Sequence, residues 1–133
     1  MKLTTKSEYT LLLLLELARK KNEVYVDLQT LCKETEVPHK YAEHLFSVLK
    51  KQHIVKGKRG SKGGYLLARP AEKISLAEII RLMDGALAAT DTVSDHFYSL
   101  TPIAKEKKVL KVFREIRDYV SNKLENITIA DLA

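Results

Sequence analysis

Residues 54–68 read IVKGKRGSKGGYLLA, two β-prone runs that flank a loop rich in glycine, lysine and arginine. The loop Arg59–Gly63 contains two glycines, which can adopt the positive φ angles that connect antiparallel strands tightly. The segment therefore predicts a β-hairpin. Because the patterns before and after it are helical, we expect a mostly α fold with one small antiparallel sheet.

Three helices are predicted before the hairpin. Thr5–Lys20 has apolar residues at helical spacing. Its inner face is expected to hold Tyr9, Leu12, Leu13, Glu16 and Leu17. Asp27 is a suitable N-cap for a second helix, and Pro38 suits the first turn of a third helix over residues 38–51. A second helix, a short break and a third helix with a polar N-terminal face form the pattern of a helix-turn-helix. With the hairpin after it, the pattern predicts a winged helix-turn-helix.

The second half of the chain predicts two further helices. The sequence SLAE at residues 75–78 is the N-terminal capping pattern of a helix that runs to about residue 84, with Gly85 as its cap. A stretch of small and polar residues follows. Thr101-Pro102 is then expected to begin a long helix that ends near residue 125, because threonine caps and proline suits the first turn.

A single apolar stripe runs along this long helix. Its members recur every three or four residues and are Val109, Phe113, Ile116, Val120 and Leu124. Such a stripe, on a helix joined to a small domain by a soft segment, favours dimerisation with a second copy of the chain. The alternative is that the helix packs back on its own domain. We expect two units, residues 1–84 and 85–133, with the apolar tail 127–133 docked.

Positive charge is concentrated in the middle of the chain. The whole chain has a formal net charge of +6, while residues 38–69 alone hold eight basic residues and one acidic residue, Glu43. A local excess of this kind is typical of a surface that binds a polyanion such as DNA. The alternative is a solvated face that only aids solubility.

Other chemistries find no support in the sequence. Lys62 precedes two glycines and a β-prone run, whereas a P-loop places its lysine between glycine and a helix. The four histidines lack metal-binding spacing, and the single cysteine, Cys32, is at a helical phase typical of a core residue. We therefore expect neither an enzyme nor a metal site. Without an apolar run of about 20 residues or a signal-peptide layout, we expect a cytoplasmic protein with no membrane contact.

A helix-turn-helix would bring three segments against double-stranded DNA. The candidate residues are Lys6 and Tyr9 at the first helix, His39, Lys40, Glu43 and His44 at the third helix, and Lys58, Arg59 and Lys62 in the hairpin. A carboxylate such as that of Glu43 can accept a hydrogen bond from the exocyclic amine of cytosine. The alternative for Glu43 is a structural partner of the helix dipole or of a nearby lysine. Narrow A·T-rich minor grooves attract an arginine such as Arg59.

These segments resemble the Rrf-two (Rrf2) family of bacterial winged helix-turn-helix transcriptional regulators. The resemblance rests on MKLTTKSEYTLLLLLELA, VPHKYAEHLFSVLKKQHIV, KGKRGSKGGYLLARP, ISLAEIIRLMDG and ITIADLA, and it covers nearly the whole chain in order. It implies a homodimer in which the long helices of the two copies cross. It also implies that the family's DNA-binding positions are held by Tyr41, Glu43, Arg59, Gly63, Gly64 and Tyr65.

The chain departs from the family pattern at one point. Members that sense through an iron–sulfur cluster carry three cysteines between the helix after the hairpin and the long helix, and residues 84–104 contain none. Since thiolates are the usual ligands of such clusters, we expect no family-type cluster and no cofactor. Some cluster-free relatives respond to a metabolite or a partner enzyme, and both remain open as effectors of this chain.

The sequence thus predicts a homodimeric, sequence-specific DNA-binding regulator that acts as a repressor. It would read a palindromic promoter site with the 38–51 helix in the major groove and the 57–64 hairpin, the wing, in the minor groove. The alternative is a protein-interaction module whose long helix binds a partner enzyme that controls DNA binding.

Overall fold

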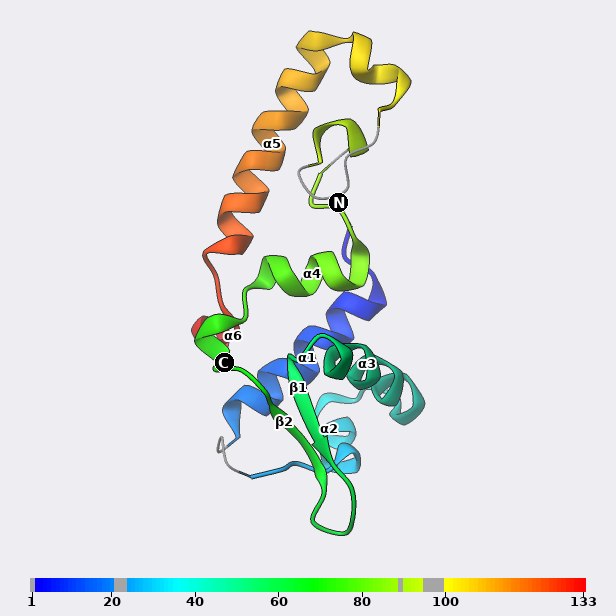
Figure 1. Ribbon diagram of the computed structural model, residues 1–133, viewed down its shortest axis with the longest axis vertical. Helices are drawn as coiled ribbons and strands as arrows, with labels where there is room; N and C mark the ends of the chain where they lie inside the picture. The colour runs from blue at the N-terminus through cyan, green and yellow to red at the C-terminus, as the bar shows by residue number, and fades with distance from the viewer. Residues whose placement is uncertain (1, 21–23, 89, 95–99) are drawn as a thin grey trace.

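Figure 1 shows the computed structural model, which describes residues 2–20, 24–88, 90–94 and 100–133. The helices and strands are α1 (Thr5–Arg19), α2 (Leu28–Thr35), α3 (His39–Lys51), β1 (Val55–Lys58), β2 (Gly64–Leu67), α4 (Leu76–Asp84), α5 (Lys107–Glu125) and α6 (Ile129–Leu132). Short 3-10 turns lie between them at η1 (Ala71–Lys73), η2 (Asp91–Val93) and η3 (Pro102–Lys105). The fold is the predicted one: a helix-turn-helix followed directly by an antiparallel hairpin, with α5 extending away as an arm (Figure 1).

The core forms where α1, α2, α3, β1 and α4 meet. Its fully buried side chains include Leu13, Leu14, Leu31, Leu45, Phe46, Leu49, Ile54 and Ile79. The predicted inner face of α1 was wrong at one position, because Leu14 is fully buried while Leu12 is 45% exposed. Five consecutive leucines contain no polar residue that would mark the phase of the helix, so the sequence could not distinguish these two.

Asp84, the last residue of α4, caps the start of α1. Its Oδ2 accepts hydrogen bonds from the Thr4 backbone N–H at 3.0 Å and from the Ser7 hydroxyl at 2.7 Å, and its Oδ1 accepts one from the Thr4 hydroxyl. Partial burial acts to raise the pKa of Asp84, but these hydrogen bonds and the positive charge of Lys6 hold the pKa below its ordinary value. The start of α1 is therefore tied to the point at which residues 85–106 begin.

The C-terminal tail docks on the winged helix, as predicted. Ile129 is fully buried in the main core, its N–H donates to the Ile74 carbonyl at 2.9 Å, and the Leu76 N–H donates to the Ile127 carbonyl at 2.9 Å. Thr128 and Asp131 form a capping box that begins α6. The tail thus packs with the first of the two predicted units, and the boundary after residue 84 remains a proposal.

The long helix begins later than predicted. Residues 102–105 form a 3-10 turn and α5 starts at Lys107, not at Pro102. The Thr101 hydroxyl does not cap a helix and lies 2.6 Å from the Thr92 hydroxyl, so a contact distant in sequence replaces the local cap. Sequence signals for a helix start report only local preferences, and here a tertiary contact overrides them.

One side of α5 packs on its own chain and another is exposed. Leu110 is buried, Leu124 packs against the small cluster of Ala77, Ile80 and Leu87, and the Arg117 guanidinium donates to the Val93 carbonyl at 2.8 Å. Of the five predicted dimerisation residues, Phe113, Val120 and Leu124 are half-buried in this way. The exposed apolar row consists of Val109, Val112, Ile116 and Tyr119.

Candidate nucleic-acid interface

The start of α3 presents a polar face to solvent. The chain leaves α2 at Glu36, which adopts the left-handed conformation with φ of 62°, and turns into α3 at Pro38. Ala42, Leu45, Phe46 and Leu49 anchor the helix in the core. The opposite face exposes the predicted residues His39, Lys40, Glu43 and His44. Such a face, held rigidly by a buried one, is what reading base edges in the major groove requires.

Two tyrosines connect α1 to the beginning of α3. The rings of Tyr9 and Tyr41 meet edge to face with centroids 5.2 Å apart, and both side chains are half-buried. The predicted contact residue Tyr9 therefore lies beside the first turns of α3, and Lys6 lies exposed one turn earlier on α1. The ring pair fixes the position of the exposed α3 face relative to α1.

The hairpin is attached to α3 by an aromatic stack. Strands β1 and β2 pair in antiparallel register, with Gly57 opposite Tyr65 and Lys58 opposite Gly64. The Tyr65 ring stacks on the Phe46 ring of α3, with centroids 4.2 Å apart and an angle of 10° between the planes. Because Phe46 is fully buried, the stack connects the wing to the core, and Tyr65 serves as a support for the wing.

The glycines of the wing have distinct roles. Gly60 turns the loop with φ of 106°. The second positive φ belongs to Gly64, at 143°, and not to Gly63 as expected from the sequence. A Cβ on Gly64 would lie 2.1 Å from the Val26 carbonyl oxygen, and one on Gly63 would lie 2.2 Å from the Lys58 carbonyl oxygen. Both positions therefore exclude any side chain, because backbone atoms occupy the space.

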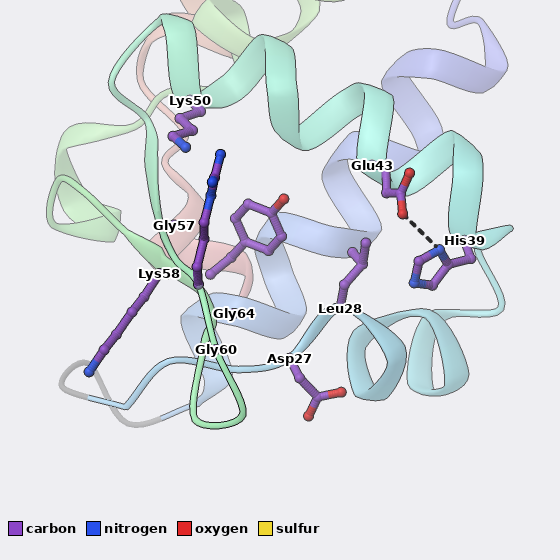
Figure 2. A pocket seen from close by; sticks show the side chains of 12 residues that line it. Asp27, Leu28, His39, Glu43, Lys50, Gly57, Lys58, Gly60 and Gly64 are labelled. Carbon is purple, nitrogen blue, oxygen red and sulfur yellow. Dashed lines mark ion pairs between the residues drawn. The ribbon is translucent and has the colours of Figure 1, made fainter.

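An open groove separates α3 from the wing (Figure 2). This inner hollow, of about 610 Å³, is bordered by His39, Glu43 and Lys50 of α3 and by residues 57–60 and 63–65 of the hairpin, together with Asp27 and Leu28. The side chains of His39, Glu43 and Lys50 lie on the α3 side of the groove, whereas Lys58 points away from it (Figure 2). Sequence reasoning missed Lys50 as a groove residue. Lys50 follows Glu43 by seven residues, or two helical turns, so both lie on the same face of α3. This spacing could have identified Lys50 from the sequence.

Glu43 lies beside His39 on the α3 side of this groove. Its Oε1 lies 3.2 Å from His39 Nδ1, an ion pair when the imidazole is protonated. Burial raises the pKa of the Tyr65 phenol, and the negative charge of Glu43 contributes to the increase. The partner of Glu43 in the free protein is thus a histidine on its own helix rather than a lysine. An exposed carboxylate with one weak partner can exchange that partner for a base.

Most of the positive charge between residues 38 and 69 is available to a ligand. Seven of the eight basic side chains are exposed, namely Lys40, Lys50, Lys51, Lys56, Lys58, Arg59 and Lys62. The eighth, Arg69, donates hydrogen bonds to both oxygens of Glu78 and to the Lys73 carbonyl. Arg69 therefore connects the end of the hairpin to α4. The Glu78 N–H donates to the Ser75 hydroxyl as predicted, but the Glu78 carboxylate binds Arg69 and does not complete the capping box.

The sequence and the fold both match known regulators. A family model described as Rrf2, iron-dependent transcriptional regulator, matches residues 3–133. The chain is 31% identical to the HTH-type transcriptional regulator CymR of Bacillus subtilis (strain 168), over 100% of this chain and 90% of that protein. It is also 31% identical to the HTH-type transcriptional regulator IscR of Erwinia tasmaniensis, over 99% of this chain and 78% of that protein. The solved structure of CymR (YrzC), the global cysteine regulator of B. subtilis, covers 100% of this chain with a TM-score of 0.80 at 30% identity.

The donor set of this chain does not fit a thiolate-held iron site. The chain has one cysteine, and Cys32 lies half-buried against the core, where burial and then the charge of Glu43 raise the pKa of its thiol. Among the described residues, no three His, Cys, Asp or Glu side chains gather so that they could hold a metal ion. Within the same residues, no helix has the length and apolar character needed to cross a bilayer. His96 lies outside the described residues.

Proposed function

Because the chain belongs to the Rrf2 family of transcriptional regulators, and is therefore a DNA-binding regulator and not an enzyme, we propose that it acts as a homodimeric repressor that reads a palindromic promoter site. The observation that carries the proposal is the inner hollow. There a polar helix face and a cationic wing are held side by side by the stack of Tyr65 on Phe46. A helix and a hairpin in this arrangement suit adjacent grooves of one duplex.

Each part of the interface has its own role in this proposal. The 38–51 helix enters the major groove, where His39, Lys40 and His44 contact base edges or phosphates and Glu43 accepts from a cytosine amine. The 57–64 wing enters the minor groove with Arg59 and Lys62. Lys6 contacts the backbone, which sets the register without reading sequence. Tyr9, Tyr41 and Tyr65 support this surface through the ring contacts described above.

Dimerisation is proposed through the exposed face of α5. Val109, Val112, Ile116 and Tyr119 recur at spacings of three and four along this face and leave apolar surface in water. Val109 and Ile116 belong to the predicted stripe, whereas Phe113, Val120 and Leu124 border it from the side that packs on the chain itself. Two wings and two α3 helices would then meet half-sites about one helical turn apart.

The regulated state depends on a signal that acts on the second unit. Residues 85–106 connect α4 to α5, and Asp84 at their start holds the first turn of α1. An effector metabolite, or a partner protein bound to the second unit at the exposed Leu100, would reach the DNA-binding unit through this connection. Capture of such a partner without any DNA binding would favour the alternative of an interaction module.

Replacing Arg59 with alanine is expected to weaken binding to the operator about tenfold, because a charge-assisted contact contributes about 1.5 kcal/mol or more. The slope of log K against log salt should fall by about one, since one counterion fewer is released. The measurement is fluorescence anisotropy of an operator duplex over a salt series. Arg19→Ala, at the end of α1 with a side chain 51% exposed, is the matched control. An unchanged affinity and slope in Arg59→Ala would show that the wing does not touch DNA.

A further inference from the structure

The wing has a second cationic side, formed by Lys62 and by Lys58, which borders the inner hollow as well. Lys58 points away from α3 (Figure 2), and its Nζ lies 5.8 Å from the centre of the Tyr25 ring. This distance is within the range in which an aromatic face attracts an ammonium group. Tyr25 is half-buried, so its ring is a fixed support rather than a mobile surface group.

The backbone holds Tyr25 beside the hairpin. The Tyr65 N–H donates to the Val26 carbonyl at 2.8 Å, and the Val26 N–H donates to the Tyr65 carbonyl at 3.0 Å. This bridge places residues 24–26 along the free edge of β2. Lys58 is opposite Gly64 in the hairpin, and Gly64 has no side chain that could separate Lys58 from Tyr25. The position of Lys58 on this side is therefore determined by the wing and by residues 24–26 together.

These residues border a second open depression. The outer hollow, of about 480 Å³, is lined by Val24, Tyr25, Asp27, Lys58, Ser61, Lys62 and Gly63. It offers two ammonium groups and a hydroxyl as donors, beside the ring of Tyr25. Its acidic member, Asp27, is engaged at the start of α2, where its two oxygens accept from the Thr30 N–H at 2.9 Å and the Thr30 hydroxyl at 2.6 Å. The remaining donors suit the oxygens of a phosphodiester.

We propose that the outer hollow binds a phosphate of the DNA backbone and that Tyr25 is the positioning residue that holds Lys58 in place for this contact. The proposal rests on the DNA-binding function above and extends it to a named site. A minor groove is about 6 Å wide and is bordered by two backbones. A wing inserted into it therefore meets phosphates on both of its sides. The inner hollow, bordered by Arg59 of the wing and Lys50 of α3, faces one backbone. The outer side of the wing faces the other backbone with Lys58 and Lys62.

The test compares Lys58→Met, Tyr25→Leu, Tyr25→Phe and the double variant Tyr25→Leu/Lys58→Met for operator affinity over a salt series. We expect Lys58→Met to lower the salt slope by about one. Tyr25→Leu should weaken binding about two- to five-fold, as expected for loss of a cation–π contact at an exposed site. Tyr25→Phe should bind like the wild type. In the Lys58→Met background, Tyr25→Leu should have no further effect, because its role acts through Lys58.

Controls separate this inference from the proposed function. Lys73→Met removes one exposed lysine from η1 and should leave the slope unchanged. A series of operator duplexes, each with one neutral methylphosphonate linkage, should include one duplex that the wild type and Lys58→Met bind with equal affinity. The linkage in that duplex marks the backbone phosphate that Lys58 contacts. If the wild type binds with salt dependence but Tyr25→Leu and Lys58→Met weaken binding additively, Tyr25 does not position Lys58. If the wild type binds no DNA, the proposed function itself is wrong.

Discussion

Replacing Ile116 with glutamate should leave the chain folded and convert the proposed dimer to a monomer. The Ile116 side chain is 48% exposed on α5 and lies in the row with Val109, Val112 and Tyr119. A carboxylate there meets water in the single chain but would be buried without a partner charge in the dimer, which costs several kcal/mol. Affinity for the palindrome should then fall by about a hundredfold or more, because two linked half-site contacts become two independent ones.

The two effects are measured separately. Sedimentation velocity reports the oligomeric state, and anisotropy with full and half operators reports affinity. Asn122→Glu adds the same charge to an exposed position on another face of α5 and should change neither. The melting temperature of the Ile116 variant, at a protein concentration where it is monomeric, indicates whether the chain itself is intact. A dimeric Ile116→Glu protein with unchanged operator affinity would contradict dimerisation through this face.

Replacing Gly64 with alanine should destabilise the protein and disable the wing. The added Cβ would lie 2.1 Å from the Val26 oxygen and 2.3 Å from the Val26 carbonyl carbon, and the residue already has φ of 143°. Strain of this backbone region costs about 1–3 kcal/mol. Separating the two backbones would also remove the two hydrogen bonds between Val26 and Tyr65, at about 1 kcal/mol each. We expect a loss of about 3–5 kcal/mol in the free energy of unfolding and at least a tenfold loss of operator affinity.

Gly60 provides the matched control for this prediction. It also has a positive φ, at 106°, but a Cβ there would meet nothing within 4 Å. Gly60→Ala therefore introduces backbone strain without the collision, and chemical denaturation should show a clearly smaller loss of stability. Equal losses in the two variants would mean that the approach of Val26 to the wing is unimportant.

The local parts of the fold were predictable because each carries its own signal. The hairpin was predicted from two β-prone runs and a glycine loop. The caps at Asp27 and Ser75 were predicted because these side chains can accept a hydrogen bond from a backbone N–H three residues later. The polar face of α3 followed from helical phase. The family resemblance, confirmed by a match over residues 3–133, reinforced these features.

The parts that could not be predicted are contacts between distant residues. Asp84 binds Thr4 across the fold, and Thr92 pairs with Thr101, which shifts the start of α5 from residue 102 to residue 107. Which apolar residues of α5 stay exposed depends on how residues 85–106 pack against the helix. No local sequence pattern predicts that packing. The outer hollow depends likewise on the bridge between Val26 and Tyr65, a contact between two segments that lie far apart in the sequence.

The most direct test of the central claim, sequence-specific DNA binding, is capture of sheared genomic DNA from the source organism by the purified protein at near-physiological salt, followed by sequencing. We expect the wild type to enrich a small set of promoter sites with palindromic half-sites about 10 base pairs apart. Glu43→Ala, run in parallel, should still capture DNA but with a relaxed base preference at one position of each half-site. Uniform recovery of the genome by the wild type would contradict the account, because it would show attraction to DNA by charge without any reading of sequence.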